Sequence, residues 1–108
     1  MTNDKYILND KGEPVVENDL IKWGQWLQSN FNKRIVKKDY FGTGKKKIEV
    51  STVFLGLDHG WCKGPPVLWE TMVFGGGELN GEMDRCSGTR KDAMAMHKSM
   101  LKKVKGTL

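Results

Sequence analysis

The chain has 108 residues, of which 38% are hydrophobic and 29% charged, a balance that excludes a disordered chain and predicts one soluble domain over residues 1–108. No segment approaches the roughly 18 apolar residues that a membrane helix needs, and the first residues lack the apolar core of a secretion signal. We therefore expect a cytoplasmic protein without membrane contact. The net charge of +5 is compatible with nucleic-acid binding and equally with a solvated basic surface.

The N-terminal third predicts an extended segment followed by a helix. Residues 1–16 include a turn sequence at residues 9–12. Asn18 or Asp19 then offers a side-chain oxygen that can cap a helix. Apolar residues recur after it at helical spacing and are expected to form its core face: Leu20, Trp23, Leu27 and Phe31.

The middle of the chain predicts four strands, and its end predicts a second helix. The strands are expected at residues 34–40, 46–57, 67–74 and 83–87, separated by turns and by a Gly- and Pro-rich loop at residues 58–66. Thr89 and Asp92 have the spacing of a capping box, and Gly106 follows the predicted helix. The inward side of this helix is expected to hold Ala93, His97, Met100, Leu101 and Val104.

This order of elements predicts an α+β fold: a four-stranded antiparallel sheet with an N-terminal and a C-terminal helix packed on one face. Tight hairpins would place Leu57 opposite Val67 and Phe74 opposite Met83. The face away from the helices would then hold Val50, Thr52, Phe54, Leu68, Glu70, Met72, Phe74, Met83 and Arg85. So apolar a face indicates a protein partner, a small ligand or a second copy of the chain in a homodimer.

Two groups of residues are candidates for binding. On the second sheet face, Glu70 and Arg85 are expected diagonally across neighbouring strands, where they form either a simple ion pair or a recognition pair. In the loop of residues 58–66, Asp58 and His59 are expected to hold the turn, and Trp61 is placed to meet a ligand.

An enzyme built on Asp58, His59 and Glu70, with Cys62 in the same loop, is the catalytic alternative. Such a site needs a nucleophile or a substrate proton within hydrogen-bond reach of the base. Asp58 and His59, as neighbours at the end of a strand, would point to opposite sides. We therefore predict binding rather than catalysis.

Neither a metal site nor a cofactor is predicted. The chain has two histidines and no HExxH motif, and its cysteines, Cys62 and Cys86, lack the CxxC spacing of zinc sites. We expect both cysteines to be reduced structural thiols. His97 lies among apolar positions of the last helix and is expected to be a hydrogen-bonded core or boundary residue.

Lysines gather in the first predicted hairpin and in the last helix. Those of the hairpin are candidates for phosphate contact in a nucleic-acid-binding module: Lys37, Lys38, Lys45, Lys46 and Lys47. Tyr40 is one of the few aromatic residues interleaved with them, so a solvated basic face is the competing interpretation.

Four segments carry a resemblance that runs over most of the chain: residues 19–26, residues 50–59 (VSTVFLGLDH), residues 64–76 (GPPVLWETMVFGG), and residues 89–93 with His97. Together they resemble small uncharacterised proteins of tailed phages and prophages. The resemblance implies expression in an infected bacterial cytoplasm and carries no assigned activity or functional residue. Members of that family look more acidic near the last helix. The chain is therefore expected to be a phage-type accessory protein that binds a host or phage partner, with a nucleic-acid-binding module as the alternative.

Overall fold

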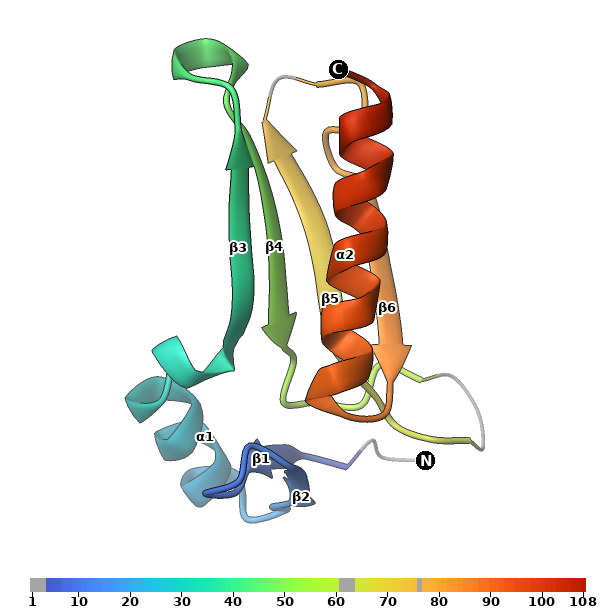
Figure 1. Cartoon of the computed structure of the whole chain (residues 1–108). Coiled ribbons are helices and arrows are strands. Elements are labelled where there is room, and N and C mark those ends of the chain that lie inside the picture. The colour runs from blue at the N-terminus through green and yellow to red at the C-terminus, as the bar shows by residue number, and fades with distance from the viewer. Residues whose placement is uncertain (1–3, 61–63, 76) are drawn as a thin grey trace.

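The computed structural model describes residues 4–60, 64–75 and 77–108. Its elements in chain order are β1 (Tyr6–Leu8), β2 (Pro14–Val16), α1 (Leu20–Ser29), the 3₁₀ turn η1 (Asn32–Arg34), β3 (Ile35–Phe41), the 3₁₀ turn η2 (Gly44–Lys46), β4 (Ile48–Phe54), β5 (Val67–Gly75), β6 (Met83–Ser87) and α2 (Arg90–Gly106). Strands β3 to β6 form a four-stranded antiparallel sheet in chain order, and β1 pairs with β2 in a separate two-stranded sheet (Figure 1). No helix in the described part of the chain is long and apolar enough to cross a membrane.

The predicted α+β fold with one helix at each end of the chain is confirmed. Helix α2 lies along one face of the four-stranded sheet (Figure 1). Helix α1 packs beside β1 at one end of the molecule, where the Trp26 ring contacts the Phe54 ring edge-on at 6.0 Å between centroids. The β1–β2 hairpin was not predicted, because strands of three residues are too short to show a periodic pattern.

Helix α1 begins where its sequence predicts but buries less than predicted. The Asp19 carboxylate accepts hydrogen bonds from the backbone N–H groups of Ile21 and Lys22 and so caps the helix. The expected core face is wrong at its two ends, since Leu20 and Phe31 are each 64% exposed. The reason is that α1 covers only the end of the sheet.

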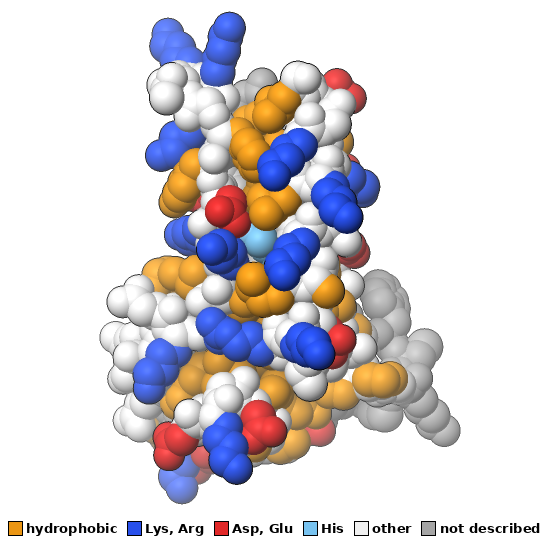
Figure 2. All heavy atoms as spheres, in the orientation of Figure 1, with side chains coloured by type: hydrophobic (Ala, Val, Ile, Leu, Met, Phe, Trp, Pro, Cys, Tyr) orange, Lys and Arg blue, Asp and Glu red, His pale blue; other side chains and the backbone are white. Residues whose placement is uncertain are grey.

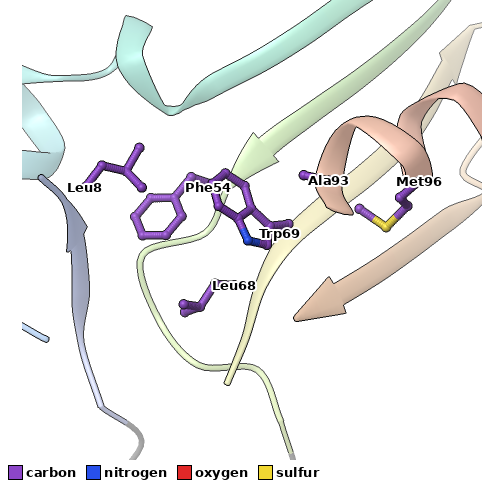
Figure 3. Close-up of a cluster of buried hydrophobic side chains, with 6 residues drawn as sticks. All are labelled: Leu8, Phe54, Leu68, Trp69, Ala93 and Met96. Atoms are coloured by element: carbon purple, nitrogen blue, oxygen red, sulfur yellow. The ribbon is translucent and has the colours of Figure 1, made fainter. Parts of the chain in front are cut away.

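The core lies between α2 and the sheet face beneath it, which we call the covered face. One cluster contains Leu8, Phe54, Leu68, Trp69, Ala93 and Met96, and the other contains Ile48, Val50, Val73, Met100 and Val104. Figure 3 shows Phe54 between Leu8 and Trp69. The Phe54 and Trp69 rings lie 5.1 Å apart, and the Trp69 indole N–H donates to the Gly88 carbonyl at 2.9 Å.

The predicted strand register between β4 and β5 is wrong by one residue. The structure pairs Phe54 with Trp69, whereas a tight hairpin with Leu57 opposite Val67 would shift this pairing by one. The cause is Gly56, whose φ of +77° turns the chain out of β4, and where a Cβ would lie 2.9 Å from the Leu27 side chain.

A slip of one residue exchanges the two faces of a strand. The side chains of Val50, Thr52 and Phe54 were expected on the second face, and they lie instead under α2. Leu68 is also in the core, at 2% exposure. The register between β5 and β6 differs from the prediction as well, because Met83 pairs with Met72 rather than with Phe74, but a shift of two residues keeps the same face.

Candidate functional site

The sheet face away from α2, which we call the open face, is covered by no described helix. Strand register places on it Lys38, Tyr40, Glu49, Ser51, Val53, Glu70, Met72, Phe74, Met83 and Arg85. Three of its apolar or aromatic side chains are about half exposed: Tyr40 at 49%, Phe74 at 45% and Met83 at 42%. Their exposure sets this face apart from the covered one.

The composition of the open face differs from the prediction because of the register slip. The residues expected from β5 and β6 do lie there: Glu70, Met72, Phe74, Met83 and Arg85. Strand β4 contributes Glu49, Ser51 and Val53 to this face. The β4 residues that were expected here, Val50, Thr52 and Phe54, lie under α2 instead. The open face is therefore a mixture of aromatic, aliphatic and charged groups.

The predicted pairing of Glu70 with Arg85 is confirmed. The two residues lie directly opposite each other rather than diagonally, and Arg85 Nε donates to Glu70 Oε2 at 2.8 Å. The side chains are 16% and 37% exposed, so the pair is partly solvated and its Coulomb energy is screened.

One row of the open face forms a hollow of about 310 Å³, which we call the Tyr40–Phe74 hollow. Tyr40 pairs with Glu49 on one neighbouring strand, and Glu49 pairs with Phe74 on the next, so Glu49 lies between Tyr40 and Phe74 in the row. Lys47 and Gly75 complete the lining, and Lys47 Nζ is 4.3 Å from the centre of the Tyr40 ring. The observed register brings Tyr40 and Phe74 into one row, which the predicted register did not show.

Tyr40 and Glu49 are joined by a hydrogen bond within the row. A hydrogen bond with Glu49 raises the pKa of the Tyr40 hydroxyl, so that Tyr40 is a neutral phenol at physiological pH. Glu49 is the acceptor of that bond and also lines the hollow. The hollow thus joins two exposed rings, one carboxylate and one ammonium group.

Asp58 and His59 have structural bonds in the loop that leads to β5. Asp58 Oδ1 accepts from the backbone N–H groups of Gly60 at 2.7 Å and Val67 at 2.8 Å, which is the turn-capping role that the sequence predicts. His59 Nδ1 lies 2.7 Å from the Leu57 carbonyl. Trp61 and Cys62 lie outside the described residues.

A buried polar network crosses the covered face. His97 Nε2 lies 2.8 Å from Asp39 Oδ2, and His97 Nδ1 lies 2.7 Å from the Thr52 hydroxyl, which is 2.5 Å from the Thr71 hydroxyl. A neutral imidazole satisfies these contacts when Nε2–H donates to Asp39 and Nδ1 accepts from Thr52. The expectation that His97 is a hydrogen-bonded core residue is confirmed.

Aspartate, histidine and a hydroxyl in this order have the composition of a nucleophilic triad. The burial of the hydroxyl argues against that use, because Thr52 and Thr71 are 0% exposed and His97 is 1% exposed. A substrate cannot reach the Thr52 oxygen, and Asp39, at 34% side-chain exposure, is the one member in contact with solvent. The network therefore holds β3, β4, β5 and α2 together.

The structure divides the candidate phosphate-binding lysines between two surfaces. Lys37 and Lys38 are neighbours on β3 and so point to opposite faces, Lys38 toward the open one. Lys45 and Lys46 form the exposed η2 turn at the hairpin tip, next to Lys47. The α2 side of the molecule also bears many Lys and Arg side chains along its length (Figure 2).

A second concavity was not predicted. A cleft of about 250 Å³ lies between the β1–β2 turn, η1 and the start of α2 and is lined by Leu8, Asn9, Asp10, Gly12, Asn32, Lys33, Ile35 and Arg90. The Asn9 amide oxygen already accepts from the backbone N–H groups of Lys11 and Glu13. Lys33 and Arg90 line the cleft together with Asp10, so the cleft favours neither anionic nor cationic ligands.

Cys86 is a free thiol, as predicted. Burial, followed by the charges of Asp92 and Asp84, raises the pKa of this thiol, which makes it a poor nucleophile at physiological pH. Among the described residues, no group of three or more His, Cys, Asp or Glu side chains is arranged to hold a metal ion.

Comparisons of the chain with protein-family models, curated proteins and solved structures gave no match.

Proposed function

We propose that this chain is a small accessory protein of the tailed-phage type, which acts in the infected bacterial cytoplasm by binding a host or phage partner. The open face is its contact surface. The observation that carries this proposal is the half exposure of Tyr40, Phe74 and Met83 on a sheet face that no described helix covers. Side chains of this kind gathered on one face are typical of interaction surfaces.

The polar groups considered for catalysis support binding rather than chemistry. Asp58 caps a turn, Glu70 holds Arg85, and His97 is buried in the network with Thr52. A general base needs a nucleophile or a substrate proton within reach, and each of these groups already bonds to the protein itself. The open face combines apolar area with interspersed charged groups, which suits recognition.

Phosphate binding by the lysines is the second candidate function. The observation that favours it is the exposed η2 turn, where Lys45 and Lys46 project at the hairpin tip. Such binding would depend on charge alone, weaken steeply with salt and show little sequence preference. It differs from the first candidate because open-face rings would not contribute.

The test is affinity capture from host and phage-infected lysates with matched surface variants. Phe74→Ser and Met83→Ser remove apolar contacts from the open face. Ile21→Ser is the control, because Ile21 is an equally apolar residue, 71% exposed, on α1. We expect the open-face variants to lose the captured component while the control retains it.

Sedimentation of the same variants separates a second copy of the chain from other partners. A dimer of the wild-type chain that dissociates in Phe74→Ser would identify the homodimer as the open-face complex. Capture that all three variants retain, with unchanged thermal stability, would refute the open face as the contact surface.

A further inference from the structure

We infer that the Tyr40–Phe74 hollow is a stacking site for unpaired nucleobases and that the adjacent lysines hold the phosphates of the same single strand. This inference rests on the proposed function, since it names the partner class for the open face. It differs from phosphate binding by the lysines alone because the exposed rings are essential to it.

The spacing of the row suits planar ligands. Adjacent strands lie roughly 4.8 Å apart, so Tyr40 and Phe74, separated by the strand of Glu49, are roughly 10 Å apart at the backbone. Each ring is about half exposed, and each can therefore receive a base on its free side. Gly75, at φ +124°, adds no side chain to the hollow, and a Cβ there would collide with the Lys47 carbonyl.

The position of Lys47 shows that the hollow has room for a group packed against the Tyr40 ring. Its ammonium group lies 4.3 Å from the Tyr40 ring centre, an exposed cation–π contact. Stacking of a base on a ring is worth more than such an exposed contact, so a base can displace the ammonium. Lys47 is then free to join Lys45 and Lys46 at the backbone phosphates.

Glu49 gives the hollow a preference among bases. An ionised carboxylate accepts hydrogen bonds and repels phosphate, so it favours a base edge that carries an amino group. Cytosine presents such a group at N4, where thymine and uracil carry a carbonyl oxygen instead. The hollow is therefore expected to prefer cytosine over thymine.

Charge complementarity favours a nucleic acid over a protein partner. A cationic side chain of a protein would find Glu49 and the Tyr40 ring attractive. Lys47, which lines the hollow, would repel it, as would Lys45 and Lys46 in the η2 turn that directly precedes Lys47. A duplex is disfavoured as well, because its bases are already stacked and paired. An unpaired strand satisfies the rings, the carboxylate and the lysines together.

The experiment is fluorescence anisotropy of labelled oligo-dC, oligo-dT and a duplex, each of about 12 nucleotides, titrated with the full chain at about 50 and 200 mM salt. We expect oligo-dC to bind more tightly than oligo-dT and both to bind more tightly than the duplex. Tyr40→Leu and Phe74→Leu keep apolar volume but remove the rings, and each should weaken single-strand binding about tenfold or more. Ile21→Leu, at an exposed apolar position on α1 away from the open face, should bind as the wild type does.

Two further variants separate the roles of the charges. Glu49→Gln should reduce the preference for oligo-dC over oligo-dT, and Lys45→Gln with Lys46→Gln should weaken all oligonucleotides and lower the salt dependence. Each variant is first checked for an unchanged melting temperature, so that a lost fold is not mistaken for a lost contact.

Absence of oligonucleotide binding at the lower salt overturns this inference. Equal affinity for duplex and single strand that neither Tyr40→Leu nor Phe74→Leu changes overturns it as well. The lysate capture then distinguishes the two proposals. If capture resists nuclease and still depends on Phe74, the open face remains a protein-binding surface. If neither oligonucleotide binding nor Phe74-dependent capture is observed, the proposed function is refuted as well.

Discussion

The covered and the open faces of the sheet are built from alternate residues of the same strands, yet they satisfy their side chains in different ways. Under α2, Phe54 and Trp69 are 0% exposed and the polar groups of Thr52, Thr71 and His97 bond to one another. On the open face, Tyr40 and Phe74 remain about half exposed, and Glu70 pairs with Arg85 in partial contact with water. One face is thus closed within the chain, while the other leaves aromatic and apolar side chains exposed to solvent.

The largest expected difference between the faces concerns their aromatic residues. Trp69→Ala should lower the free energy of unfolding by about 3 to 5 kcal/mol, because it empties the centre of the first core cluster and leaves the Gly88 carbonyl without its donor. Phe74→Ala, on the open face of the same strand, should cost about 1 kcal/mol or less. Urea denaturation of both variants measures the two values.

Similar losses from Trp69→Ala and Phe74→Ala would contradict this contrast. They would show that the open face is as important to folding as the covered one, and its exposure could then not be ascribed to binding.

The next effect concerns the buried polar network. Thr52→Val keeps the shape of the side chain but deprives both His97 Nδ1 and the Thr71 hydroxyl of a partner, so we expect a loss of about 1 to 3 kcal/mol. Combining Thr52→Val with His97→Leu should cost less than the sum of the single changes, because the second change removes a group that the first left unsatisfied.

A double-mutant cycle by thermal or urea denaturation measures this coupling. Additive losses would mean that Thr52 and His97 act independently and that their 2.7 Å contact does not bind β4 to α2.

The open-face ion pair should matter less. Arg85→Ala should change the free energy of unfolding by about 1 kcal/mol or less, because Arg85 is 37% exposed and the Coulomb attraction to Glu70 is screened by water and salt. The difference from wild type should shrink further at about 1 M salt. A loss that persists at high salt would instead indicate packing of the Arg85 stem against its neighbours, and Arg85→Met would then restore stability.

Features set by neighbouring residues were predictable from the sequence, and features set by distant ones were not. The capping box of Thr89 and Asp92 spans one helical turn, and the β-branched and aromatic runs mark the four strands; all of these are present. The register of β4 against β5 depends on how Gly56 packs against α1, which no local pattern encodes.

The candidate site shows the same division. Glu70 and Arg85 were expected to pair across neighbouring strands and do so, because a register error of two residues leaves both on the same face. The contact of His97 with Asp39 joins residues 58 positions apart, and the row of Tyr40, Glu49 and Phe74 needs the correct register of two hairpins. An error of one residue therefore hid the hollow while leaving the fold class intact.

The smallest expected effect concerns the N-terminal cap of α2, the helix that lies on the covered face. The Thr89 backbone N–H and hydroxyl donate to Asp92 and hold the pKa of this carboxyl below its ordinary value. Its stabilisation is therefore fully present above the ordinary pKa of an aspartate and is lost as the pH falls through the lower pKa of the folded state. Asp92→Asn should lower the melting temperature at neutral pH, and the gap to wild type should close in this acidic range.

Glu78→Gln is the matched control, since it removes one exposed negative charge outside any helix cap. A gap for Asp92→Asn that stays constant down to the acid transition would assign the effect to side-chain geometry rather than to charge. Because α2 keeps its packing on Val50 and Val73 in either case, the covered face should stay closed, and single-strand binding at the open face should be unchanged.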